Sequence, residues 1–310
     1  MATTPLEPPP PLVAMLRGAL GVPERRITLF GTIGCLGLLG LIFWPNLHQF
    51  VRIWSTDGNY SHGFLVPLIS LYFANLAARR GPVAVRDGVT LGSALLGISL
   101  FGRLATVVIP VGFVGDLSFL LGLAGVCTLI FGTDVLRRYW FAFFFLIFMV
   151  PLPVALYAKI ASPLQLMVSQ VASAVMNATG LPVLREGNMM TLPGGVQMFV
   201  AEACSGMRQL TGFLALTAAV AYLSARPAWF RLAVVASAVP IALTANIARV
   251  ILTGYIMRYV DPQFASGSYH TVEGLLMMAF GLSLLRAGCL VLDLVLDLTR
   301  PAPPVAVARS

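Results

Sequence analysis

Long apolar runs separated by short basic loops constrain this chain more than any other feature of its sequence. A helix needs roughly 20 apolar residues to cross a bilayer. Eight runs approach or reach that length, at 27–45, 63–78, 89–109, 113–132, 139–157, 205–224, 231–257 and 272–294. Only 10% of the residues are charged and 58% are hydrophobic, whereas about 25% of the residues in a soluble domain are charged. A bilayer can cover this much apolar surface, so we expect an all-α polytopic membrane protein with eight transmembrane helices.

The basic residues between the runs indicate the side of the membrane on which each loop lies, because cytoplasmic loops carry an excess of Lys and Arg. With the N-terminus in the cytoplasm, eight crossings leave only Arg52, Lys159, Arg185 and Arg258 outside. A ninth crossing by the more polar stretch 160–181 would move the basic loop SARPAWFR to the outside. We therefore expect this stretch to form a helix that lies on the outer leaflet or dips into it.

Between this helix and the sixth span, two short β-prone segments, Val183–Glu186 and Val196–Val200, flank a turn-rich middle. We expect them to form a small β-hairpin on the outer surface. A proline-rich cytoplasmic N-terminus (1–26) precedes the membrane domain (27–297), and a short cytoplasmic tail (298–310) follows it. The sequence thus predicts one integral membrane domain with no separate soluble domain.

The segment AEACSGMR contains the first candidate site residue, Cys204, where the outer loop meets the start of the sixth span. A helix N-terminus offers free backbone N–H groups and the positive end of the helix dipole. Both stabilise a thiolate, which is the nucleophilic form of cysteine, and the same N–H groups can form an oxyanion hole. Cys204 alone also fits one more small buried residue, and the polar residues around it in the sequence, Glu202, Ser205 and Arg208, favour a reactive cysteine.

The other cysteines, Cys35, Cys127 and Cys289, lie inside apolar runs, where we expect them to be buried by packing. The four cysteines include no CxxC pair. The sequence therefore indicates no zinc site and no disulfide framework, and we expect neither a metal nor a cofactor.

Two further segments bring polar residues to the expected depth of Cys204. In the seventh span, Asn246, Arg249 and Thr253 share one face of an otherwise apolar helix, and a charged residue within a span usually faces a polar cavity. His270 begins the eighth span, and histidine can act as general base toward a thiol and as general acid toward a leaving group. Arg249 alone also fits a snorkelling residue, and His270 alone fits an ordinary polar residue at a helix end. Their coincidence with Cys204 on one side of the membrane favours a site.

The first outer loop, WSTDGNYSHG, is polar and lies on the same side of the membrane in this topology. Asp57, Tyr60 and His62 are candidates for lining the site or for binding substrate. An ordinary solvated loop has the same composition, so both interpretations stay open here.

Taken together, these segments resemble the bacterial exosortases. The resemblance rests on four motifs in the same order, namely YSHGFLVPL from Tyr60, EACSGMR around Cys204, Asn246-x-x-Arg249, and His270 before the last span. It covers most of the chain. Each motif is short, but the four in this order and topology make the match specific, and they imply an eight-span membrane enzyme of the transpeptidase type.

Enzymes of this family are thought to process proteins with a C-terminal sorting tail, which has a Pro-Glu-Pro-type motif, a membrane helix and a basic end. The resemblance implies that Cys204 is the nucleophile, Arg249 the oxyanion stabiliser and His270 the acid/base. The expected supporting residues are Glu202, Ser205, Arg208 and Asn246. The enzyme would lie in the bacterial cytoplasmic membrane, with its active site on the periplasmic face, and would be linked to exopolysaccharide systems. The expected partners are tail-bearing membrane-anchored proteins and the lipid bilayer, not nucleic acid.

Two alternatives stay open. A membrane thiol protease that only hydrolyses its substrate would use the same residues. A non-catalytic transporter or assembly protein for exopolysaccharide export would also explain the apolar bulk and the intramembrane Arg249. Transporter sites lie near the middle of the bilayer, whereas the polar residues here gather toward one face of the membrane.

Overall fold

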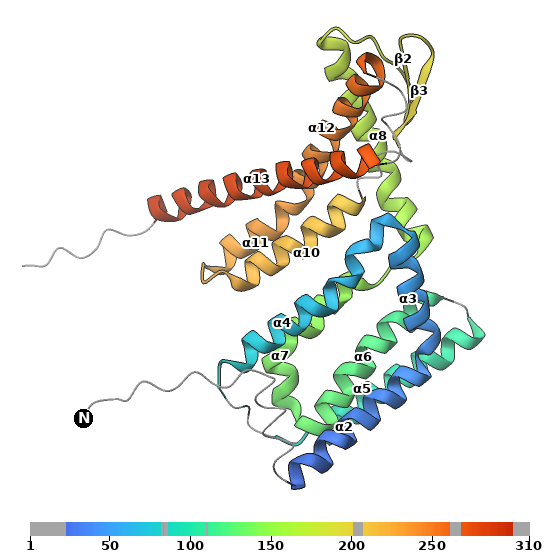
Figure 1. The fold of residues 1–310 in the computed structure, drawn as a ribbon. Coiled ribbons are helices and arrows are strands. Elements are labelled where there is room, and N and C mark those ends of the chain that lie inside the picture. Colours follow the sequence, from blue (N-terminus) through green and yellow to red (C-terminus); the bar gives the residue numbers. More distant parts are fainter. Residues whose placement is uncertain are drawn as a thin grey trace, which may run out of the picture. The chain divides into compact units, whose positions relative to one another are not determined.

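The computed structural model describes residues 23–81, 83, 86–109, 111–200, 207–260 and 268–299. Most of them are helical, and the chain divides into two compact units between Tyr157 and Ala158. The first unit contains α2 (Pro23–Ile42), α3 (Trp44–Thr56), the 3-10 helix η1 (Gly58–Phe64), α4 (Val66–Ala78), α5 (Val89–Val108), α6 (Gly112–Phe131), α7 (Thr133–Phe145) and the 3-10 helix η2 (Leu146–Met149). Helix α8 (Val154–Ala178) begins in the first unit and continues into the second. The second unit also contains β1 (Leu184–Glu186), β2 (Met189–Leu192), β3 (Val196–Phe199), α10 (Met207–Leu223), α11 (Ala228–Ala236), α12 (Ala238–Tyr259) and α13 (Ser268–Thr299) (Figure 1).

Several helices of the described chain can cross a membrane, as the apolar runs predict. Five segments are long and apolar enough, namely Gly58–Ala78, Val89–Val108, Gly112–Phe131, Ala228–Tyr259 and Gly274–Leu298. The number rises to seven if each of two bent helix pairs, α2 with α3 and α7–η2 with α8, is one span. The remaining predicted span, 205–224, corresponds to α10, of which 17 residues are described. The multi-pass helical fold is thus confirmed, while the count of eight stays a prediction.

The first bent pair is α2 and α3, whose axes meet at 73°. Pro45 lies in the first turn of α3 and has no N–H group, so it interrupts the ladder of helical hydrogen bonds. Arg103 of α5 donates from Nε to the Ile42 carbonyl oxygen at 3.1 Å. Asn46 donates from Nδ2 to the Asp116 carboxylate of α6 at 2.8 Å. These two hydrogen bonds hold the bend between α2 and α3 against α5 and α6.

Helices α5 and α6 pack closely against each other in the first unit. A Cβ atom at Gly92 would lie 2.6 Å from the backbone nitrogen of Leu129, so only glycine permits this approach. Ser99 donates from Oγ to the Ser118 carbonyl oxygen at 2.7 Å. Small residues at the contact and hydrogen bonds across it are typical of helices that associate within a membrane.

Between η2 and α8 the chain leaves the helical conformation at residues 150–153. The predicted fifth span, 139–157, is therefore wrong at its end, because the next helix already begins at Val154. Pro151 and Pro153 explain the break, since neither has an N–H group and a proline disfavours the helical conformation of the residue before it. The residues directly after Pro153 are again apolar, so hydropathy alone does not indicate this boundary.

A sheet of three antiparallel strands in the order β1–β2–β3 follows α8. The predicted two-stranded hairpin is wrong about its middle, which forms β2. The glycines of the two connections, Gly187, Gly194 and Gly195, have φ angles of 64°, 89° and 76°, a conformation that glycine adopts without strain. On β2, Met190 and Leu192 are 0% and 2% exposed and belong to a core cluster with residues of α8 and α12.

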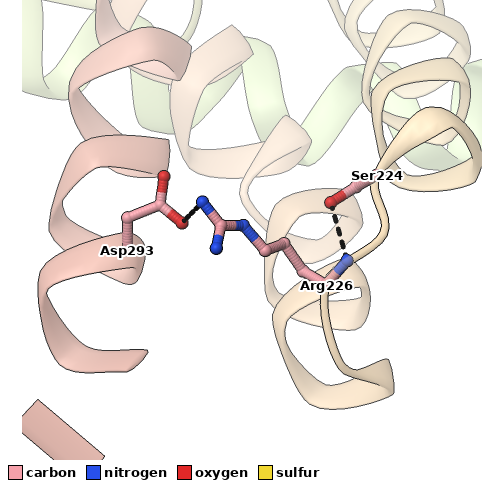
Figure 2. Close-up of polar contacts among 3 residues, drawn as sticks. All are labelled: Ser224, Arg226 and Asp293. Carbon is pink, nitrogen blue, oxygen red and sulfur yellow. Dashed lines mark hydrogen bonds and ion pairs between the residues drawn. The ribbon is translucent and has the colours of Figure 1, made fainter. Parts of the chain in front are cut away.

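Helices α10 to α13 pack together in the second unit, where α11 and α12 together form the predicted seventh span. Arg226, between α10 and α11, forms an ion pair with Asp293 of α13 at 2.9 Å, and its backbone N–H donates to Ser224 Oγ at 3.3 Å (Figure 2). Phe213 of α10 lies against Gly281 of α13 so closely that a Cβ atom at Gly281 would collide with the ring. Helix α10 therefore contacts α13 as well as its neighbours in sequence.

The three cysteines of the apolar runs are less buried than expected. Cys35 is exposed on α2, and Cys127 and Cys289 are partly buried. The expectation of buried packing is wrong for Cys35, because α2 directs many apolar side chains outward. A transmembrane helix can present such a face to lipid, where an apolar side chain needs no protein neighbours.

Candidate functional site

A polar face on α12 is the best described part of the candidate site. Asn246, Arg249 and Thr253 are 3%, 5% and 1% exposed, and their spacing places them on one side of the helix. Thr253 donates from Oγ1 to the Arg249 carbonyl oxygen at 2.9 Å. A snorkelling arginine would extend its guanidinium group to the surface of the protein, but Arg249 is buried inside the second unit.

The cysteine segment lies largely outside the described residues. This holds for Cys204 and for the supporting candidates Glu202 and Ser205. The described chain resumes at Met207, where α10 begins, and Arg208 is exposed in its first turn. Helix α10 follows Cys204 in the sequence, and the conformation and contacts of Cys204 stay a prediction.

The histidine segment is described only in its backbone. His270 lies in the first turn of α13, as predicted, and its side chain is outside the described residues. Helix α13 packs against α12, and α12 packs against α10. The structure thus brings together the helix that follows Cys204, the helix that carries Arg249 and the helix that begins with His270.

A small cavity shows how closely α10 approaches the polar face of α12. Leu210 of α10 and Asn246 of α12 both line it, and its other lining residues are apolar. Its volume of about 20 Å³ is enough for one water molecule. The first turn of α10 therefore lies beside Asn246.

The predicted first outer loop, which includes η1, has contacts within the first unit. Tyr60 is buried, and its hydroxyl oxygen accepts a hydrogen bond from the Leu152 backbone N–H at 3.1 Å. His62 donates from Nε2 to the Phe148 carbonyl oxygen at 3.2 Å. Asp57 accepts from the Asn59 backbone N–H at 2.9 Å and caps η1.

A further residue that the sequence analysis did not single out contacts the same segment. Trp54 donates from Nε1 to the Met149 carbonyl oxygen at 3.0 Å. Trp54, Tyr60 and His62 thus bind backbone groups at residues 148–152, around the break between η2 and α8. Backbone groups freed from a helix within a membrane need such partners, because lipid supplies none.

The comparison with protein families adds the deciding observation. The family model described as transmembrane exosortase matches residues 54–287, which is most of the chain. The chain belongs to the transmembrane exosortase family. No curated protein and no solved structure matches it. Family membership and the candidate spans together establish a multi-pass membrane protein.

Within this exosortase, the matched region includes both groups of polar residues. It begins at Trp54, in front of the outer loop, and extends past His270 into α13. The resemblance drawn from the four motifs is thereby confirmed at the level of the family. The roles of Cys204, Arg249 and His270 within it remain predictions.

The sequence analysis also missed a buried glutamine in this exosortase. Gln209 of α10 is 6% exposed. Among the residues that the structure describes, neither its Oε1 nor its Nε2 has a hydrogen-bond partner. The signal in the sequence was a single amide that follows Cys204 by five residues at the start of an apolar helix.

Proposed function

We propose that this exosortase is a membrane-embedded cysteine transpeptidase or protease that cleaves C-terminal sorting tails. The observation that carries the proposal is the burial of Arg249 on α12. This helix packs against α10, which follows Cys204 in the sequence, and against α13, whose first turn includes His270. A charged residue within a membrane segment is costly and marks a functional site by default. Family membership supports the same conclusion.

The proposed reaction begins with the Cys204 thiolate, which attacks the carbonyl carbon of the scissile peptide bond. Arg249 and backbone N–H groups stabilise the negative charge on the tetrahedral oxygen. His270 gives a proton to the leaving amine as the C–N bond breaks, so the tail departs and a thioester joins the substrate to Cys204. An amine or water then attacks the thioester carbonyl, His270 takes the proton of this nucleophile, and the C–S bond breaks to release the Cys204 thiolate.

The proposed topology has eight spans, with the sixth at 205–224, which includes α10. The 17 described residues of α10 reach the lower limit of the roughly 17–25 that cross a bilayer. This topology puts the three candidates at the periplasmic face of the bacterial cytoplasmic membrane. A substrate held by its own membrane helix would present its cleavage motif at this depth.

The decisive experiment replaces the nucleophile. The wild-type protein and Cys204→Ala are reconstituted in lipid with a tail-bearing substrate, and the products are identified by mass spectrometry. We expect cleavage and a trapped thioester on Cys204 in the wild type, and a loss of at least about 1,000-fold in the variant. Cys127→Ala is the control and should cleave normally.

Two results would contradict the proposal. Undiminished cleavage by Cys204→Ala would exclude Cys204 as the nucleophile, and no cleavage by the wild type would leave export or assembly of an exopolysaccharide as the alternative. A second substrate with a free amine separates transpeptidation, which gives a joined product, from hydrolysis, which gives a free carboxylate.

A further inference from the structure

The amide of Gln209 is an unusual group to bury without a partner. A buried polar group that forms no hydrogen bond destabilises the fold, and an apolar side chain of the same size would remove this cost. Gln209 is 94% buried, being 6% exposed, and within the described part of the chain both its amide atoms lack partners. Within the described residues the amide adds no hydrogen bond to the fold, which points to a ligand as its partner.

The surroundings of Gln209 point toward the candidate site. Gln209 and Phe213 are four residues apart on α10 and share one face of the helix. Phe213 lies against Gly281 of α13, the helix whose first turn includes His270. The next residue, Leu210, lines a cavity together with Asn246 of α12. Gln209 therefore lies in the part of α10 that packs against the two helices carrying Arg249 and His270.

The amide of a glutamine side chain has one strong acceptor and two N–H donors, so it offers both kinds of group that a peptide unit offers. It can accept a hydrogen bond from a backbone N–H and donate one to a backbone carbonyl. The beginning of any helix leaves up to four backbone N–H groups without partners, and lipid cannot supply them. A substrate that passes from an extended cleavage motif into a membrane helix has such unpaired groups where the helix starts.

We infer that Gln209 binds the backbone of the substrate at the junction between its cleavage motif and its membrane helix. This inference rests on the proposed function. In that proposal α10 runs from Cys204 into the membrane, and Gln209, five positions after Cys204, contacts the part of the substrate that leaves with the tail. Recognition of backbone groups does not depend on side chains. It therefore suits tails whose helices differ in sequence.

The test compares Gln209→Met with Thr217→Val in full-length protein reconstituted in lipid. Methionine has the length of glutamine without its amide. Thr217 lies on the same face of α10, is 0% exposed, and donates to the Phe213 carbonyl oxygen within its own helix at 2.8 Å. Initial rates are measured with a synthetic tail-bearing peptide over a range of peptide-to-lipid ratios. Thermal unfolding is measured for each variant.

For Gln209→Met we expect KM to rise about five- to tenfold with kcat nearly unchanged, because a hydrogen bond of ordinary strength is lost in ground state and transition state alike. Its unfolding midpoint should be equal to or above that of the wild type. Thr217→Val should keep both kinetic constants. A Gln209→Met enzyme with wild-type KM, or with a clearly lowered unfolding midpoint, would overturn the inference.

A modified substrate identifies the atoms involved. In this peptide, the amide N–H groups at the start of the membrane helix are replaced one at a time by ester oxygens. At one position the wild type should lose rate and Gln209→Met should lose little more, because both changes remove the same hydrogen bond. Equal losses in both enzymes at every position would overturn the inference while leaving the proposed function intact. Failure of the wild type to cleave the amide peptide would instead overturn the proposed function itself.

Discussion

Two sets of buried or half-buried polar side chains differ in what they do for the fold. In the first unit, Trp54, Tyr60 and His62 each form a hydrogen bond with the backbone around the break between η2 and α8. In the second unit, Gln209 has no partner among the described residues, and Arg249 is a buried charge in an otherwise apolar helix. The first set completes the fold. Among the described residues the Gln209 amide adds cost without a hydrogen bond, which indicates that it is retained for a ligand, and a charge within a membrane segment such as Arg249 marks a functional site by default.

This difference revises the role of the outer loop. The sequence alone left open whether Tyr60 and His62 bind substrate or lie in a solvated loop. The structure gives both residues a partner in the chain itself, so they do not need a substrate to satisfy their hydrogen bonds. Binding of substrate by these residues stays a prediction, and the comparison favours an architectural role.

The largest effect should come from the second set, in Arg249→Lys. Lysine keeps the positive charge but lacks the planar group that donates two parallel hydrogen bonds. Loss of one oxyanion donor costs about 100- to 1,000-fold in kcat, and we expect a decrease in this range with a tail-bearing substrate. Circular dichroism and thermal unfolding should change little.

The matched control is Arg258→Lys, at the last turn of the same helix. Arg258 is exposed and lies over the ring of Tyr259, at 5.6 Å from its centroid. This variant should cleave like the wild type. If Arg249→Lys were also fully active, Arg249 would join the first set as a structural residue.

Sequence reasoning succeeded where a single property decides the structure. Length and hydropathy located the apolar spans, and the motifs around Cys204 and Arg249 led to the family. It failed where two properties compete. The prolines at 151 and 153 break the chain inside an apolar stretch, and Met190 alternates with partly buried neighbours between two glycine-containing turns.

Gln209 shows a different limit of the sequence. A glutamine at the start of an apolar helix can donate and accept within its own helix ends, face a loop, or stay unpartnered. Only the packing of α10 against α12 and α13 distinguishes these cases. Burial without a partner is a property of the assembled helices, and no spacing of residues along the chain predicts it.

A smaller effect is expected in the first set, from Gly63→Ala. Gly63 lies directly against the Trp54 indole, and a Cβ atom there would collide with Nε1. The ring must move away, which strains its hydrogen bond to Met149. We expect a loss of about 1–3 kcal/mol in the free energy of unfolding, measured in detergent. The kcat of the folded fraction should change by less than about twofold.

Gly97→Ala provides the comparison for this variant. Gly97 lies in α5 with no atom within 4 Å of the added Cβ. Alanine favours a helix over glycine by about 1 kcal/mol, so this variant should be as stable as the wild type or more so. A Gly63→Ala protein with wild-type stability but an altered KM would contradict this comparison, because it would show that the loop around Gly63 binds substrate.

The smallest effect should come from the ion pair between Arg226 and Asp293, which belongs to neither set. The two side chains are 40% and 33% exposed, so solvent and salt screen their attraction, and such pairs contribute about 0–1 kcal/mol. Arg226→Gln should therefore lower the unfolding midpoint by at most a few degrees, and the difference should shrink as salt increases. Asp293→Asn should behave alike, and the double variant should lose less than the sum of the two. A loss as large as that of Gly63→Ala, or one that does not depend on salt, would show that this pair is effectively buried and stabilises the fold as Trp54 and Tyr60 do.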